Sequence, residues 1–131
     1  MVSVFFVVPN SLKMKILIFE NSRQIAERLI ELIAETMKDV TFYKASSYGE
    51  ALYFLNECNP DAVLLDFEFP GNSSIELLKK IKSSNDKTMV LALLSQMNES
   101  NVKQCELHGA DFIFDKYADF EQIPAIVNAI W

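Results

Sequence analysis

The chain has 131 residues, half of them hydrophobic, which is enough to form the core of one compact domain and leaves little room for a second. Eighteen acidic residues against twelve basic residues give a formal net charge of -6, and no run of Lys or Arg offers a surface for a phosphate backbone or an anionic lipid. The composition therefore argues against direct binding to nucleic acid or to membranes. Cys58 and Cys105 lie far apart and outside any CxxC pattern, so we expect two buried free thiols in a reducing compartment.

Residues 1–13 are predicted to be an apolar N-terminal extension, and residues 14–131 to be the folded domain. The run MVSVFFVV lacks a cationic start and a small-residue cleavage site and is too short to span a bilayer, so we expect neither export nor anchoring and place the protein in the cytoplasm. The run ends at the breaker cluster Pro9-Asn10-Ser11. Because the connector that follows can reach the outer edge of the second strand, we expect the extension to add an antiparallel edge strand or to contact another molecule.

Five short segments with few polar residues are predicted to be strands. They cover residues 15–19, 40–43, 62–65, 89–94 and 112–114. The segments 15–19 and 62–65 are nearly or wholly apolar, which is typical of strands that are covered on both faces. The segment 40–43 is the weaker strand of the set.

A helical pattern follows each predicted strand. Apolar residues recur at three- and four-residue spacing within residues 25–37, 51–55 and 75–81. Residues 98–107 form a shorter, more polar helix that ends before Gly109, and residues 120–131 form the last helix. Strands that alternate with helices pair in parallel through right-handed crossovers, so the sequence predicts an α/β fold with one doubly wound, five-stranded parallel sheet and helices on both faces.

Polar side chains stand where the predicted strands end. They are Glu20 and Asn21 after the first strand, Asp66 after the third, Ser95 after the fourth, and Lys116 after the fifth. In sheets of this class the polar site lies beyond the carboxyl ends of the strands, at the point where the strand order reverses. Carboxylate oxygens suit Mg2+, and an Asp carboxylate can itself become an acyl phosphate. An ammonium and a hydroxyl can then neutralise and hydrogen-bond a transferred phosphoryl group.

Each of these residues also has an ordinary structural interpretation. Asp66, Glu20, Asn21 and Ser95 can cap the helices that follow them, and Lys116 can be a surface lysine. His108 invites a phosphohistidine role, but beside a Gly at a helix end it is better explained by contacts with the last helical carbonyls. The combination of residues at one sheet edge, more than any single residue, favours the phosphoryl-transfer interpretation.

Four segments in this order resemble the response regulator receiver family of two-component signalling. They are KILIFEN, PDAVLLDFEFPG, LLS and GADFIFDK, and the resemblance extends from about Lys15 to the C-terminus. It implies the flavodoxin-like strand order 2-1-3-4-5 and a phosphoryl group accepted by Asp66. It also implies a metal shell of Glu20, Asn21, Asp66 and the backbone carbonyl of Glu68, with Ser95 as the switch hydroxyl and Lys116 as the family's ammonium.

Four positions depart from the pattern of that family. Asn21 stands where a metal-binding Asp is usual, Ile113 replaces the switch aromatic, Gln96 replaces a small residue, and Tyr117 replaces a Pro. Loss of one carboxylate beside a divalent ion weakens the attraction, so we expect Mg2+ to bind weakly. An aliphatic residue at 113 cannot make the edge contacts through which an aromatic side chain reports phosphorylation.

The leading functional hypothesis is a stand-alone receiver that accepts a phosphoryl group on Asp66 and switches a protein partner. Its expected partners are a sensor histidine kinase or phosphotransfer protein and a downstream effector, and self-association into a homodimer is left open. The alternative is a degenerate pseudo-receiver that acts as a phosphate-independent interaction module. A small hydrolase or flavin protein is disfavoured, and we expect no enzyme, because the sequence has no P-loop, no Rossmann glycine pattern and no nucleophile elbow.

Overall fold

The computed structural model describes residues 13–84 and 87–131, and these residues form one five-stranded parallel sheet in the order β2-β1-β3-β4-β5. The strands are β1 (Met14–Phe19), β2 (Val40–Ala45), β3 (Ala62–Asp66), β4 (Met89–Leu94) and β5 (Phe112–Asp115). The predicted fold class and strand order are confirmed. The predicted N-terminal extension, residues 1–13, lies outside the described residues except for Lys13.

A helix follows every strand, as the alternating pattern predicted. The helices are α1 (Arg23–Thr36), α2 (Tyr48–Cys58), α3 (Ser73–Ser84), α4 (Glu99–Leu107) and α5 (Ile123–Ile130), with short 3-10 turns at Pro70–Asn72 and Phe120–Gln122. The last helix was expected to begin at Phe120, but α5 begins at Ile123. Pro124 explains the later start, because proline lacks a backbone N–H and fits only the first turn of an α-helix.

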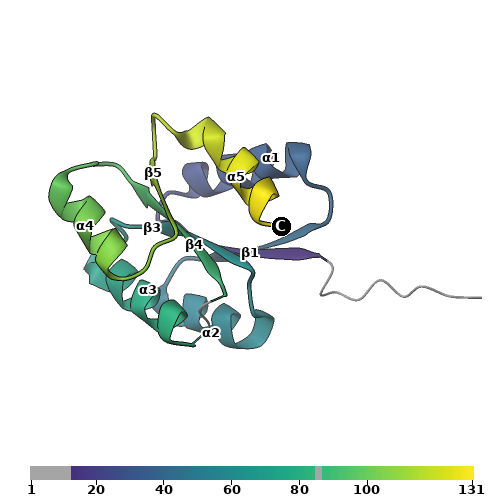
Figure 1. Ribbon diagram of the computed structural model, residues 1–131. Helices are drawn as coiled ribbons and strands as arrows, with labels where there is room; N and C mark the ends of the chain where they lie inside the picture. Colours follow the sequence, from purple (N-terminus) through teal and green to yellow (C-terminus); the bar gives the residue numbers. More distant parts are fainter. Residues whose placement is uncertain (1–12, 85–86) are drawn as a thin grey trace, which may run out of the picture.

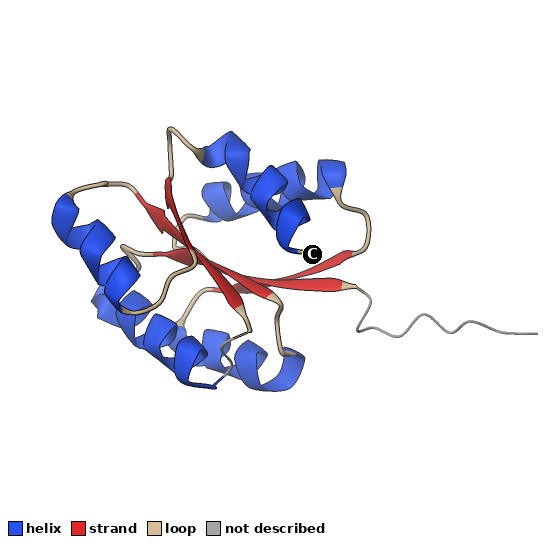
Figure 2. Ribbon diagram, in the orientation of Figure 1, coloured by secondary structure: helices blue, strands red, loops and turns tan. Residues whose placement is uncertain are grey.

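The helices cover the sheet in two layers. Figures 1 and 2 show α1 and α5 on one face and α2, α3 and α4 on the other. Among the described residues, one buried apolar cluster joins the sheet to α1 and α5, a second joins it to α2 and α3, and a smaller third joins β4 to α4. The strand β3 is buried along its whole length, which explains why its sequence is apolar without alternation. In the described part of the chain, no helix has the length and apolar character needed to cross a bilayer.

Polar caps fix where three of the helices begin. The side chains of Ser22, Ser47 and Asn98 accept backbone N–H groups of the first turns of α1, α2 and α4, at 3.3, 3.1 and 2.8 Å. These contacts satisfy N–H groups that have no partner inside the helix. Because Ser22 caps α1, Glu20 and Asn21 are not used for that purpose.

The two cysteines are free, but they differ in burial. Cys105 of α4 is fully buried, and its burial raises the pKa of its thiol to about 12. Cys58 was also expected to be buried, and it is only half-buried. It is the last residue of α2 and lies beside Tyr43 of β2, an edge strand of the sheet.

The strand register brings the expected site to one edge of the sheet. Phe19 of β1 is paired with Leu65 of β3, and Asp66 is paired with Leu93 of β4. Leu94 of β4 is paired with Asp115 of β5. The residues that follow these positions therefore emerge side by side.

Candidate functional site

Asp66 is the last residue of β3 and is 2% exposed. Its Oδ2 accepts the backbone N–H of Asn21 at 3.2 Å, and its Oδ1 accepts the backbone N–H of Glu68 at 3.0 Å. The Ser74 hydroxyl of α3 donates to the backbone carbonyl of Asp66. The carboxylate is thus held between the loops that follow β1 and β3, and it does not cap α3.

Lys116 is buried at the same edge, with 8% of the residue exposed. Its Nζ lies 2.8 Å from Glu20 Oε1 and 2.9 Å from Asp66 Oδ1. Its backbone N–H donates to the carbonyl of Leu94 at 2.8 Å, which ties the end of β5 to the end of β4. Lys116 is therefore no ordinary surface lysine, because its ammonium is withdrawn from water and shared by two carboxylates.

Burial shifts the protonation of this cluster. Desolvation raises the pKa of Glu20 from 4.5 to about 7, although the ionic contact with Lys116 and the hydrogen bond from Ser22 oppose the shift. Burial by itself would lower the pKa of Lys116, but its contacts with Glu20 and Asp66 raise the pKa above the ordinary value. The ammonium of Lys116 is therefore charged at neutral pH, whereas the carboxyl group of Glu20 titrates near neutral pH.

The arrangement fits a hard divalent cation. Glu20 Oε2 accepts the backbone N–H of Ser22 at 2.8 Å, whereas the buried Glu20 Oε1 receives no hydrogen bond of good geometry, although the ammonium of Lys116 lies in ionic contact with it. Within residues 13–84 and 87–131, no three His, Cys, Asp or Glu side chains are grouped as metal ligands. A site with two carboxylates, completed by an amide or carbonyl oxygen and water, suits Mg2+, which keeps several waters.

Asn21 lies at the rim of this edge with its side chain exposed. A cavity of about 330 Å3 opens there, and Glu20, Asn21, Arg23, Lys44 and Ser46 are among the residues that line it. Asn21 contacts Asp66 through its backbone N–H. Its amide side chain is therefore free to turn toward solvent or toward an ion.

Ser95, the first residue after β4, is exposed and lies at the predicted edge. Its backbone N–H donates to both carboxylate oxygens of Glu68, at 2.9 and 3.1 Å. The backbone N–H of Gln96 makes a longer contact of 3.4 Å with the same carboxylate. The side chain of Glu68 thus joins the β3 loop to the β4 loop.

Sequence reasoning assigned Glu68 only a backbone carbonyl and overlooked its side chain. The sequence did indicate that the Glu68 side chain lies near the site, because Glu68 stands two residues after the proposed acceptor in a turn segment. Sequence reasoning also overlooked Ser74, which is buried and donates to Asp66. The signal was its spacing, because Ser74 stands three and four residues before Leu77 and Leu78 and shares the buried face of α3 with them.

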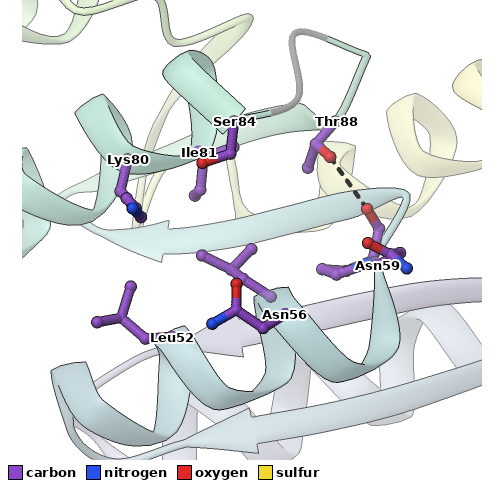
Figure 3. Close-up of a pocket in the computed structure, with 9 residues that line it drawn as sticks. Leu52, Asn56, Asn59, Lys80, Ile81, Ser84 and Thr88 are labelled. Atoms are coloured by element: carbon purple, nitrogen blue, oxygen red, sulfur yellow. Dashed lines mark hydrogen bonds between the residues drawn. The ribbon is translucent and has the colours of Figure 1, made fainter.

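A second pocket, of about 220 Å3, lies at the opposite end of the sheet. Figure 3 shows Leu52 and Asn56 of α2 on one side of it, and Lys80, Ile81 and Ser84 of α3 on the other. The Thr88 hydroxyl closes one end by donating to the carbonyl of Pro60 at 3.2 Å. None of the predicted site residues lines this pocket, since it lies near the amino ends of β3 and β4.

Comparison with known proteins identifies the domain type. A family model described as the response regulator receiver domain matches residues 16–128. The sensory transduction protein LytT of Oceanobacillus iheyensis is 25% identical over 120 residues, which cover 91% of this chain and 48% of LytT. The two-component response regulator PhoP of Pseudomonas aeruginosa is 26% identical over 117 residues, which cover 89% of this chain and 51% of PhoP. The chain spans about half the length of these curated relatives.

Solved structures share the same fold. The signal receiver domain of a DNA binding response regulator protein from Colwellia psychrerythraea has a TM-score of 0.83 at 22% identity, over 90% of this chain and 98% of that chain. The receiver domain of the Francisella response regulator 1452 has a TM-score of 0.78 at 24% identity, over 90% and 96% of the two chains. At such identities the likeness is one of architecture.

Proposed function

We propose that Asp66 accepts a phosphoryl group in a two-component phosphorelay. The chain belongs to the response regulator receiver domain family, whose model matches residues 16–128. The observation that carries this proposal is the contact of the Asp66 carboxylate with the buried ammonium of Lys116, at 2.9 Å. A buried carboxylate beside a cation is suited to nucleophilic attack, because the cation offsets the charge that accumulates on the transferred phosphoryl group.

The proposed reaction is a transfer from phosphohistidine. An oxygen of the Asp66 carboxylate forms a bond to phosphorus as the phosphorus–nitrogen bond breaks, and the electron pair of that bond goes to the imidazole nitrogen. The product is an acyl phosphate on Asp66. Lys116 neutralises one phosphoryl oxygen and the Ser95 hydroxyl hydrogen-bonds another, so positioning and charge stabilisation supply the catalysis.

Receiver domains generally bind Mg2+ at an acidic pocket, and this edge has the donors for it. Glu20, Asp66, the amide oxygen of Asn21 and the backbone carbonyl of Glu68 are the proposed ligands. Bound Mg2+ supplies positive charge that offsets the charge of the phosphoryl oxygens. Because Asn21 contributes an oxygen without a charge, the proposed affinity is weak.

The proposed donor is a sensor histidine kinase or a phosphotransfer protein, in the cytoplasm, and the output passes to an effector protein. The fourth helix, fifth strand and last helix are the surface proposed for that output. Action as a stand-alone domain stays a prediction, since the curated relatives are about twice as long. In this proposal the domain receives the phosphoryl group from its donor and acts as a switch.

Phosphorylation can be tested by mass. We would incubate the protein with Mg2+ and phosphoramidate and record the intact mass, and we expect a gain of one phosphoryl group. Asp66→Asn should remove the gain while the fold is preserved, and Asp39→Asn, which alters an exposed carboxylate, should retain it. A phosphoryl group on the Asp66→Asn protein, or none on the wild type, would overturn the assignment.

A further inference from the structure

Glu68 connects the proposed acceptor to the loop after β4 from both of its ends. Its backbone N–H donates to Asp66 Oδ1 at 3.0 Å. Its carboxylate accepts the backbone N–H of Ser95 at 2.9 and 3.1 Å and that of Gln96 at 3.4 Å. One residue therefore spans the gap between two adjacent strand ends.

Two backbone N–H groups of the loop after β4 hold the carboxylate of Glu68. They belong to the consecutive residues Ser95 and Gln96. The same loop is held from its other side, since Asn101 of α4 donates its side-chain amide to the carbonyl of Gln96 at 3.0 Å. With its carbonyl fixed, the loop presents its N–H groups toward Glu68.

Glu68 links these N–H groups to Asp66, since its backbone N–H donates to Asp66 Oδ1 and its carboxylate accepts the N–H of Ser95. Asp66 is paired with Leu93 in the sheet, and Ser95 stands two residues beyond Leu93. Backbone N–H groups that hold a carboxylate also suit a phosphoryl oxygen, because both are anions with exposed lone pairs. The acyl phosphate would carry nearly two negative charges where the free carboxylate carried one, and this charge would repel a carboxylate bound at the same N–H groups.

We propose that the carboxylate of Glu68 is a latch: it occupies the Ser95 and Gln96 N–H groups in the unmodified domain and has to leave them when Asp66 carries a phosphoryl group. The inference rests on the proposed phosphorylation of Asp66. Glu68 is thus an internal anion that stands in for the phosphoryl group. It stabilises the unmodified position of the β4 loop, and by linkage it opposes binding of the phosphoryl group.

Two substitutions test separately the reach of the Glu68 side chain and its negative charge. Glu68→Asp keeps the negative charge but shortens the side chain by one methylene, so that the carboxylate is withdrawn from the β4 loop. Glu68→Gln keeps the length but removes the charge, and it leaves one neutral acceptor for the loop. Glu99→Gln is the matched control, because Glu99 is an exposed acid in the first turn of α4 and pairs with Lys103 on the surface of that helix.

The probe is beryllofluoride, a tetrahedral anion that imitates a phosphoryl group on a carboxylate. We would titrate it at saturating Mg2+ by calorimetry and follow hydrogen exchange of the Ser95 and Gln96 amides by NMR before the anion is added. We expect both amides to lose protection in Glu68→Asp, and beryllofluoride to bind that variant about fivefold more tightly than wild type, at the low end of ordinary coupling strengths. Glu68→Gln should lie between the two, and Glu99→Gln should match wild type.

Four outcomes would contradict the proposed latch or the phosphorylation on which it rests. Equal affinity of wild type and Glu68→Asp overturns the latch, and tighter binding by Glu68→Gln alone assigns the effect to charge and overturns it as well. Unchanged exchange of both amides in Glu68→Asp would show that the loop does not depend on this carboxylate. If wild type and all variants fail to bind beryllofluoride at saturating Mg2+, the proposed phosphorylation of Asp66 fails first and the latch with it.

Discussion

Lys116 and Glu20 form an ion pair inside the carboxyl edge of the sheet, with Nζ 2.8 Å from Oε1 and with side chains 8% and 0% exposed. Asp66 Oδ1 lies 2.9 Å from the same ammonium. Two buried carboxylates thus share one cation. Removal of that cation leaves two buried carboxylates without a counterion.

The first prediction concerns that cation. Lys116→Met keeps most of the side-chain volume but leaves Glu20 and Asp66 unpaired, so the free energy of unfolding at neutral pH should fall by about 3 kcal/mol. Urea denaturation measures the loss. Lys103→Met is the control, because Lys103 forms an exposed pair with Glu99 and its removal should cost no more than about 0.5 kcal/mol. Equal losses in the two variants would show that burial of the Lys116 ammonium does not add to the free energy of unfolding.

The second prediction is a dependence of stability on pH that comes from Glu20. Its pKa is raised by burial from 4.5 to about 7 in the folded chain, so the folded state binds this proton more tightly than the unfolded state. The contribution of Glu20 is therefore fully present below about pH 4.5 and is lost as pH rises through 7. Over that interval it should fall by at most about 3 kcal/mol, at 1.36 kcal/mol for each pKa unit.

Glu20→Gln isolates this contribution, because the amide does not titrate. The unfolding free energy of wild type minus that of the variant, from urea denaturation at several pH values, should decline between acid and neutral pH. A difference that is flat across this range, or that grows with pH, would contradict the raised pKa. Added Mg2+ should reduce the decline if Glu20 is a ligand, since the ion favours the charged carboxylate.

The third prediction concerns the missing carboxylate at Asn21. Asn21→Asp adds one negative charge at nearly constant volume, and a net gain of about 1.4 kcal/mol would tighten Mg2+ binding about tenfold. Without metal, the same charge should repel Glu20 and Asp66 and lower the melting temperature. Titration of Mg2+ against the melting temperature tests both effects. Asn56→Asp, which adds the same charge in α2 at the opposite end of the sheet, should leave the Mg2+ response unchanged.

An identical Mg2+ response of wild type and Asn21→Asp would mean that residue 21 does not face the ion. The proposed metal site, and with it much of the case for phosphorylation, would then have to be withdrawn. The exposed position of the Asn21 side chain makes this a demanding test.

The fourth prediction concerns a contact between α3 and the segment before β5. Asp111 Oδ2 accepts Lys82 Nζ at 2.6 Å and the backbone N–H of Val90 at 2.7 Å, and Lys82 also donates to the carbonyl of Thr88 at 2.9 Å. The two charged side chains are 18% and 27% exposed. Asp111→Ala leaves partly buried donors without an acceptor, so we expect a loss of about 2 kcal/mol in thermal or urea unfolding.

Glu27→Ala is the matched control for this contact. Glu27 pairs with Arg23 on the surface of α1, where the side chains are 47% and 86% exposed, and its removal should change stability by about 0.5 kcal/mol or less. Comparable losses in both variants would contradict the role assigned to Asp111.

The sequence by itself determined the architecture and the edge at which the site lies. Apolar segments that alternate with helical patterns leave parallel pairing as the ordinary solution, and parallel strands carry their carboxyl ends to one edge. Asp66 could be singled out because an unbroken apolar run leads directly into it. The extents of the elements needed local corrections, as at Pro124, where a missing backbone N–H delays the start of α5.

Only the tertiary structure decided how the side chains at that edge meet. The burial of Lys116 between Glu20 and Asp66, and the reach of Glu68 to Ser95, join residues that are distant in sequence. Local propensity and periodicity cannot predict such contacts, because they depend on how far each side chain is withdrawn from water once the strands are packed. The half-buried position of Cys58, at the end of α2 beside an edge strand, was likewise visible only in the folded chain.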